Sequence, residues 1–330
     1  MEGGALKLQI QCVILMILMI AGTVPVSHCA LDTPSRIILA TEFIESQYVA
    51  SVGLVRECPF AFPNRIWLVK DNIFASFVLN WTHPDLSKNI LSRIREKFGG
   101  EIDNGNLGVL LDKRVLPDIP IGVNNSGRFL RSIDGFDIYT EKPANPMNDF
   151  ADYADLLGFV CISRYNAGDM ENATRYYNQL SSKWDGHGIA DTVYDNKTKL
   201  YSTYKAAIFL YVTNLLNVTC SFKTDVEYAI WRTQELSNAS QYGGIHTEYT
   251  IENVTGDTNI ETTAWVIAAF SLPESAPRPS PPIPEVTLMA EVAIVGMTAT
   301  GMYLHTHRKR RLGRDIGDLT EKTHFARARP

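Results

Sequence analysis

The feature that most constrains this chain is a pair of apolar segments, one near each end, because such segments limit which part of a chain folds as a globular domain. Near the start, an apolar run over 10–21 follows Lys7. Small residues at Ser27 and Cys29 then match the pattern that precedes a signal-peptidase site. The pattern predicts a signal peptide at 1–29.

Near the end of the chain, residues 286–303 form an apolar stretch long enough to cross a hydrocarbon core of roughly 30 Å. A buried core helix is the alternative interpretation, since Glu291 dilutes the apolar character. We favour a transmembrane helix at 286–305, because the basic cluster at 308–311 is typical of a cytoplasmic flank. The expected location is therefore the plasma membrane, single-pass, with the N-terminal domain outside and the basic tail 306–330 in the cytoplasm.

The stretch between the two apolar segments carries seven Asn-X-Ser/Thr triplets, the acceptor pattern for N-glycosylation. The acceptors are Asn80, Asn124, Asn172, Asn196, Asn217, Asn238 and Asn253. This distribution agrees with a translocated glycoprotein, although the high content of Asn, Ser and Thr alone would supply several of the triplets.

Charge and cysteine content exclude some classes of site and partner. The formal net charge is −5 although the tail is basic, so the rest of the chain is acidic, which argues against a nucleic-acid partner. After the signal peptide, Cys58, Cys161 and Cys220 remain, an odd number that permits at most one disulfide. No Cys or His spacing is typical of zinc, so we expect no metal and no cofactor.

A single domain is expected at 30–272, followed by a proline-rich stalk at 273–285. Within the domain, apolar residues recur at helical spacing in paired segments. The expected helices cover about 73–81, 86–98, 150–161, 170–184, 200–215, 226–236 and 258–270. The stretch 101–146 breaks this pattern. Its short β-like segments, at 108–111, 119–123 and 136–140, predict an irregular insertion with a little sheet.

The second helix of each pair is followed by an aromatic residue and glycine, which suits a helix that ends in the left-handed conformation. The endings are Phe98-Gly99-Gly100, Trp184-Asp185-Gly186 and Tyr242-Gly243-Gly244. After two of them the chain continues through a loop before the next helix starts. The period of the chain is therefore a helical hairpin plus a loop.

These hairpins, their endings and the run Gly256-Asp257-Thr258-Asn259-Ile260-Glu261-Thr262-Thr263-Ala264 resemble the (α/α) toroid superfamily, which includes six-hairpin glycosidases, terpenoid cyclases and prenyltransferases. The resemblance implies a mainly α fold of antiparallel helical hairpins in a complete or partial toroid, with substrates bound in a funnel where the loops meet. The inner helices would start near residues 65, 147, 200 and 258. The C-terminal segment, with Ile283-Pro284-Glu285 before the apolar span, also resembles the sorting signals of some archaeal surface proteins.

Candidate catalytic residues are carboxylates near the expected starts of inner helices. Two carboxylates separated by roughly 5 to 10 Å could act as acid and base on a glycosidic bond. The candidates are Asp71, Asp191, Asp257 and Glu261. Helix capping is the alternative role for Asp71 and for Glu261, since Thr258-x-x-Glu261 matches a capping box.

The loop Trp184–Gly188 is the richest polar and aromatic cluster of the chain and is a candidate ligand contact. The candidate ligand-binding residues are Trp184, Asp185, His187, Asp191, Tyr249 and Asp257. Aromatic rings at helix ends could stack on sugars, whereas core packing is the alternative. His187 and His246 hold comparable loop positions, but without further ligands we expect surface histidines rather than a metal site. The loops 184–195, 242–257 and 64–71 are expected to converge on one rim.

Two functions of different class follow from the sequence. We favour a cell-surface anchored binding or structural module without catalysis. The alternative is a carbohydrate-active enzyme, a hydrolase, lyase or epimerase on extracellular polysaccharide, so enzymatic activity stays open. Expected partners are the membrane, through a single span, and an extracellular glycan or surface-layer protein. Because a fold supports many functions, the geometry of the site has to decide between the two.

Overall fold

The computed structural model describes residues 31–99, 105–191 and 199–272. Its helices are α2 (Thr33–Ser46), η1 (Leu68–Ile73), α3 (Phe74–Leu79), α4 (Pro84–Phe98), η2 (Gly105–Leu107), α5 (Gly108–Leu111), η3 (Phe150–Asp152), α6 (Ala154–Asn166), α7 (Met170–Ser181), α8 (Thr203–Leu216), α9 (Lys223–Trp231) and α10 (Ile260–Ser271). Helices α3, α4 and α6 to α10 lie close to the predicted segments, whereas α2 and α5 were not among the expected helices.

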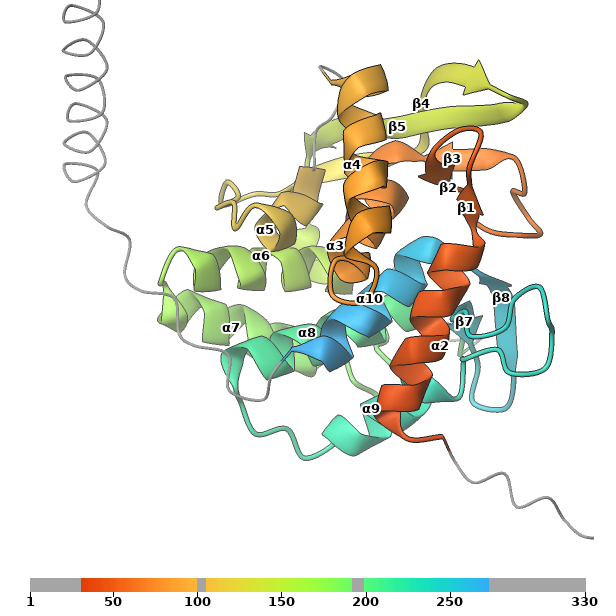
Figure 1. Cartoon of the computed structure of the whole chain (residues 1–330). Coiled ribbons are helices and arrows are strands. Elements are labelled where there is room, and N and C mark those ends of the chain that lie inside the picture. Colours follow the sequence, from red (N-terminus) through yellow and green to blue (C-terminus); the bar gives the residue numbers. More distant parts are fainter. Residues whose placement is uncertain (1–30, 100–104, 192–198, 273–330) are drawn as a thin grey trace, which may run out of the picture.

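The strands of the described residues form three small sheets. They are β1 (Tyr48–Val49), β2 (Leu54–Val55), β3 (Arg65–Trp67), β4 (Ile121–Ile133), β5 (Phe136–Pro146), β6 (Tyr201–Ser202), β7 (His246–Tyr249) and β8 (Val254–Thr258). The strand orders are β1-β2, β3-β5-β4 and β6-β7-β8. All neighbours are antiparallel except β3 and β5, which run parallel. Figure 1 shows the long β4-β5 ribbon at one end of the molecule and β7-β8 at one side.

Helices α8 and α10 form the centre of the core because they are apolar on nearly every face. The two helices pack side by side, and α10 also contacts α2 and α3. Trp265 on α10 is fully buried, and its ring lies 4.9 Å from that of Phe74 on α3. Helix α6 packs against α8, and α4 packs against α3, which itself contacts α10.

The start of α3 is held by a wide helical turn, the π-helix η1, and by one buried asparagine. The side chain of Asn72 accepts a hydrogen bond from the backbone N–H of Val55 at 2.8 Å and donates to the carbonyl of Val55 at 3.0 Å. It also donates to the carbonyl of Trp67 at 3.1 Å. Asn72 therefore joins η1 to β2 and β3, which fixes where α3 begins.

A second set of hydrogen bonds ties α3 to α4. The hydroxyl of Ser87 on α4 donates to the carbonyl of Ser76 on α3 at 2.7 Å, and the hydroxyl of Ser76 donates to the carbonyl of Asn72 at 2.8 Å. Helix α4 itself begins with Pro84 and Asp85 and ends with Arg95 and Lys97, the charge order that the helix dipole favours. The pair α3 and α4 is therefore a rigid hairpin.

The predicted fold class was wrong, because the architecture is mixed α and β rather than a mainly α toroid. Helices α3 and α4, α6 and α7, and α8 and α9 pack as neighbours, but sheets cover three further parts of the structure. Strands of two to five residues, such as β6, β7 and β8, are too short to give a periodic signal in the sequence. Within 101–146, a little sheet was expected, and the structure has the longer strand pair β4-β5 there, whereas the segment 108–111 is helical and not β-like.

The membrane prediction also has to be corrected. Among the described residues, no helix combines the length and the apolar character that a membrane crossing requires. This finding contradicts the predicted single span and, with it, the membrane partner and the plasma-membrane location. The segments on which those predictions rested, 1–29, 273–285, 286–305 and 306–330, lie outside the described residues.

Candidate functional site

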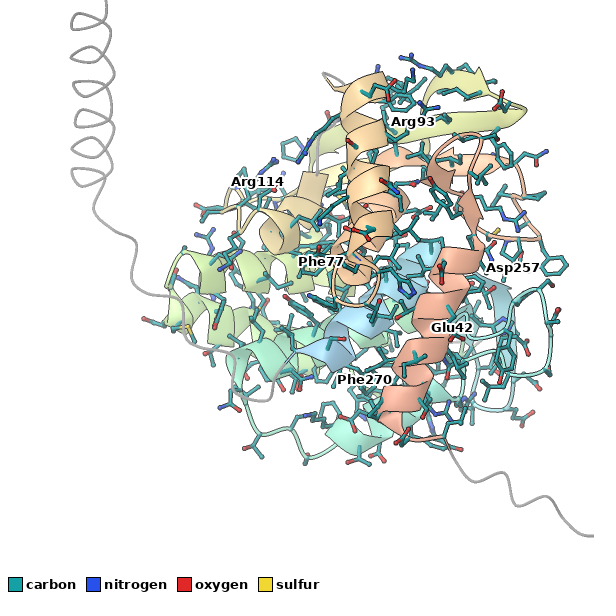
Figure 2. The ribbon with its side chains drawn as sticks, viewed as in Figure 1. Glu42, Phe77, Arg93, Arg114, Asp257 and Phe270 are labelled. Carbon is teal, nitrogen blue, oxygen red and sulfur yellow. The ribbon has the colours of Figure 1, made fainter. Side chains whose placement is uncertain are left out.

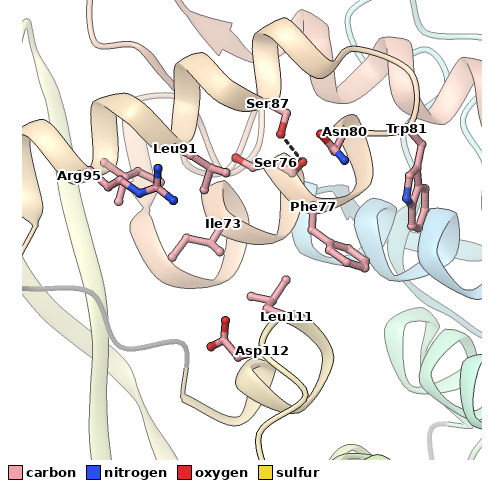
Figure 3. Close-up of a pocket in the computed structure, with 11 residues that line it drawn as sticks. Ile73, Ser76, Phe77, Asn80, Trp81, Ser87, Leu91, Arg95, Leu111 and Asp112 are labelled. Atoms are coloured by element: carbon pink, nitrogen blue, oxygen red, sulfur yellow. Dashed lines mark hydrogen bonds between the residues drawn. The ribbon is translucent and has the colours of Figure 1, made fainter. Parts of the chain in front are cut away.

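A pocket of about 520 Å³ opens between α3, α4 and α5 (Figure 3). Its volume falls in the range of small-molecule sites, roughly 300 to 1,000 Å³. Six of the eleven lining residues are apolar or aromatic, and the other five are polar or charged. The lining residues are Ile73, Ser76, Phe77, Asn80, Trp81, Ser87, Leu91, Ile94, Arg95, Leu111 and Asp112.

One wall of the pocket is a single stripe of α4. Ser87, Leu91 and Arg95 recur every four residues, so their side chains lie on the same face of the helix. The stripe is about 12 Å long from Ser87 to Arg95 at the rise of an α-helix. The opposite wall comes from Leu111 at the end of α5 and from Asp112, the residue that follows it.

The end of the pocket away from Arg95 is aromatic. Phe77 on α3 and Trp81 in the turn after it meet edge to face, with ring centroids 5.3 Å apart. Trp81 is 47% exposed, which is high for an indole next to an apolar cavity. The expected helix at 73–81 includes Trp81, but α3 ends at Leu79, so the ring leaves the core. An aromatic wall of this kind offers a face for stacking.

Few polar groups of the pocket are available to a ligand. The hydroxyls of Ser76 and Ser87 already donate to backbone carbonyls. Asp112 faces Arg114, with 3.9 Å between carboxylate and guanidinium. Arg95 is exposed, and no hydrogen bond or ion pair joins its side chain to another described residue. The pocket therefore has an apolar middle, an aromatic end and a charged end.

The loop that the sequence singled out, Trp184–Gly188, is organised by Asp185. Its Oδ1 accepts from the backbone N–H groups of His187 at 3.0 Å and Gly188 at 3.1 Å. Its Oδ2 accepts from the hydroxyl of Tyr201 at 2.7 Å and from the ammonium of Lys199 at 3.3 Å. Burial alone would raise the pKa of Asp185, but these hydrogen bonds outweigh it and lower the pKa below its ordinary value. Four donors on one carboxylate indicate a loop anchor.

The aromatic residues expected to stack on a ligand pack inside the protein instead. Tyr249 is 1% exposed, and its ring lies 5.4 Å from that of Tyr201. The ring of Trp184 stacks on Phe222 at 5.4 Å with an interplanar angle of 2°. The strands β6 and β7 pair Tyr201 with Tyr249, so the structure does bring Trp184, Asp185 and Tyr249 into one neighbourhood. His187 in the same loop is exposed.

None of the four candidate catalytic carboxylates lines the pocket. Asp191 is buried and forms an ion pair with Lys205, and it accepts from the backbone N–H of Ala154 at 3.3 Å. Asp257 on β8 accepts from the backbone N–H of Ala61 at 3.0 Å. In Figure 2, Asp257 lies on the opposite side of the molecule from Arg114, which marks the α5 side of the pocket.

The remaining two catalytic candidates, Asp71 and Glu261, also do not line the pocket. Asp71 is 2% exposed within η1, and Glu261 is half-buried in the first turn of α10. The predicted cap of α10 is shifted by one residue. Asn259, and not Thr258, accepts the hydrogen bond from the backbone N–H of Thr262, at 2.8 Å.

The glycosylation acceptors occupy different environments. Asn80, Asn217, Asn238 and Asn253 are exposed, and Asn80 lines the pocket. Asn172 is half-buried in α7, where its amide donates to Asp169 at 2.6 Å. The side chain of Asn124 and all of Asn196 lie outside the described part of the chain. Glycosylation therefore stays a prediction.

Comparison of the chain with protein-family models, with curated proteins and with solved structures found no significant match. The assignment of a site therefore rests on the geometry of the chain itself. The pocket was missed in the sequence because its walls come from two separate segments, 73–95 and 111–112. The available signal was the four-residue spacing of Ser87, Leu91 and Arg95, which combines a small, an apolar and a charged residue on one helical face.

Proposed function

We propose that this protein is a binding module for a small ligand and that its site is the pocket between α3, α4 and α5. The observation that carries the proposal is the combination of a cavity of about 520 Å³ with an apolar middle and a few polar groups at its ends. Ligand pockets typically have this composition, since apolar surface supplies affinity and sparse polar groups supply orientation.

The binding role has more support than the carbohydrate-active alternative. A glycosidase needs two carboxylates facing one cavity, separated by roughly 5 to 10 Å. Asp112 is the acidic residue among those that line this pocket. Asp191 and Asp257, two of the candidates from the sequence, accept hydrogen bonds from Ala154 and Ala61, and neither lines this pocket. These contacts favour structural roles for both carboxylates.

The test is a thermal-shift screen of small organic compounds against the protein and against a variant whose pocket is filled. Leu91→Trp adds a large side chain to the α4 wall, where Leu91 is half-buried. Ile38→Trp on α2 is the matched control, because Ile38 is 54% exposed and does not line the pocket. A ligand at 100 times its Kd should stabilise the protein and the control by about 2.7 kcal/mol and should leave Leu91→Trp unchanged.

Two results would contradict the proposal. Compounds that stabilise Leu91→Trp as much as the unaltered protein would place the binding site elsewhere. A screen in which no compound stabilises the protein, at concentrations that reach typical Kd values of roughly 1 mM, would leave the pocket without a ligand-binding role.

A further inference from the structure

We infer that the pocket binds an amphipathic carboxylate, a small molecule with an elongated apolar body and one carboxylate that pairs with Arg95. The inference rests on the proposed function, since it names the ligand class of the same pocket. Three observations carry it: the unengaged guanidinium of Arg95, the apolar stretch beside it and the aromatic wall at the far end.

Around the pocket, Arg95 is the charged side chain that pairs with no other described residue. On α4, the carboxylate of Glu96 is already engaged by Arg93 at 3.6 Å and by Lys97 at 2.7 Å. Across the pocket, Asp112 faces Arg114. No hydrogen bond or ion pair connects the guanidinium of Arg95 to another described residue. The remaining charge at this end is therefore positive.

A guanidinium recognises a carboxylate in a specific geometry. Its planar fork donates two parallel N–H bonds to the two oxygens, which an ammonium cannot do. In Figure 3 the Arg95 side chain extends beside Leu91 and Ile73, so a bound carboxylate would continue directly into the apolar part of the pocket. The apolar body would then lie against Leu91 and Leu111.

The aromatic end sets the length and the character of that body. About 12 Å of helix separates Ser87 from Arg95, and the rings of Phe77 and Trp81 lie beyond Ser87 in the direction away from Arg95. A ligand with a ring at the end opposite its carboxylate would place that ring against Trp81, whose exposed indole offers a face for stacking. Asn80 adds an amide at the same end.

The experiment compares three probes that share one body and differ in the head group. The probes are 7-phenylheptanoate, 7-phenylheptan-1-ol and 7-phenylheptylamine, and binding to the full chain is measured by calorimetry and by the change in tryptophan fluorescence. The expected order places the carboxylate about tenfold tighter than the alcohol, a value typical of one charge-assisted contact at a partly exposed site, with the amine weakest.

Two variants test whether Arg95 causes the preference for the carboxylate head group. Arg95→Gln should abolish the tenfold preference for the carboxylate while leaving the alcohol affinity unchanged. Lys88→Gln on the same helix is the matched control, because it removes the same charge from an exposed side chain that does not line the pocket. It should change every affinity less than twofold. Circular dichroism confirms that both variants fold.

The outcomes separate the ligand class from the proposed function. Equal binding of carboxylate and alcohol, with no effect of Arg95→Gln, would overturn the carboxylate inference and leave the pocket as the site. Tightest binding of the amine, lost in Asp112→Asn, would overturn it in favour of a cationic ligand. Failure of all three probes, together with a screen that finds no compound, would overturn both.

Discussion

A buried carboxylate is stable only when its charge is balanced, and Asp191 is balanced by Lys205. Both side chains are almost fully buried, and Asp191 also accepts from the N-terminal backbone of α6. The sequence placed Asp191 among the catalytic candidates because it follows a polar loop. Its partner, Lys205, lies on α8. The packing of the folded chain brings the two charged groups together.

Asp191→Asn should lower the free energy of unfolding by about 3 to 5 kcal/mol, because it removes the carboxylate that faces a buried ammonium. Urea unfolding of both proteins measures the change. The matched control is Asp257→Asn, where an amide oxygen can still accept from Ala61, and the expected loss is about 1 kcal/mol or less. The double change Asp191→Asn with Lys205→Met should cost less than the two single changes added together. A loss in Asp191→Asn no larger than in the control would contradict the structural role.

Glu235 is expected to make the free energy of unfolding decrease as the pH falls. Burial alone would raise its pKa, but hydrogen bonds from Ser237, Asn238 and His246 outweigh it and lower the pKa to about 2. A carboxyl with a lowered pKa contributes stability that is present above its unfolded pKa of roughly 4.3 and is lost as the pH falls toward the folded pKa. Stability should therefore decrease between about pH 4.5 and pH 2 partly through this group.

The measurement is the free energy of unfolding at about pH 6 and about pH 3, in the protein and in Glu235→Gln. The neutral variant cannot titrate, so the difference between the two pH values should become smaller. Glu252→Gln, at an exposed position of the β7-β8 turn, is the control and should leave the difference unchanged. An unchanged difference in Glu235→Gln would refute the assignment.

At the scale of elements, most of the longer helices were predictable because the spacing of apolar residues within each segment indicates a helix. Apolar residues at a spacing of three and four place α3, α4, α6, α7, α8, α9 and α10 close to their expected positions. The strands were less predictable, because β6 has two residues and β7 has four, and their pairing joins segments more than 40 residues apart. A strand is stabilised by pairing with another strand, and the residues of one strand do not identify its partner.

The start of α10 illustrates how a boundary shifts by one residue. Thr258 matches a capping residue in the sequence, but it ends strand β8 and is fully buried, so Asn259 takes the capping position. Asn259→Ala should lower the free energy of unfolding by about 1 kcal/mol, whereas Asn259→Asp should retain stability because a carboxylate also caps the helix and complements its dipole. Thermal unfolding measures both. Equal losses in the two variants would argue against capping by this side chain.

At the scale of the whole molecule, one side chain connects four helices. Trp265 on α10 is fully buried and meets Phe74 on α3 at 4.9 Å, Phe159 on α6 at 5.8 Å and Tyr211 on α8 at 5.9 Å. Its ring therefore joins the hairpin that carries the pocket to the rest of the core.

Trp265→Ala should cost about 3 to 5 kcal/mol, because it leaves a large cavity among these helices. Trp265→Phe should cost less than half as much, since it keeps an aromatic ring and removes an indole N–H that has no acceptor among the described residues. Urea denaturation followed by far-UV circular dichroism measures both, and a loss in Trp265→Ala below about 1 kcal/mol would contradict the central position of this residue.

The sequence by itself determined where most of the longer helices lie, that a little sheet falls within 101–146, and which residues carry charge. These features are local, since each depends on residues within one or two turns of chain. Only the tertiary structure decided that the fold is mixed, that Tyr249 and Asp191 are buried, and that a pocket forms where Leu111 and Asp112 face Arg95. Burial and concavity arise from contacts between distant segments, and a pattern along one segment does not specify what will pack against it.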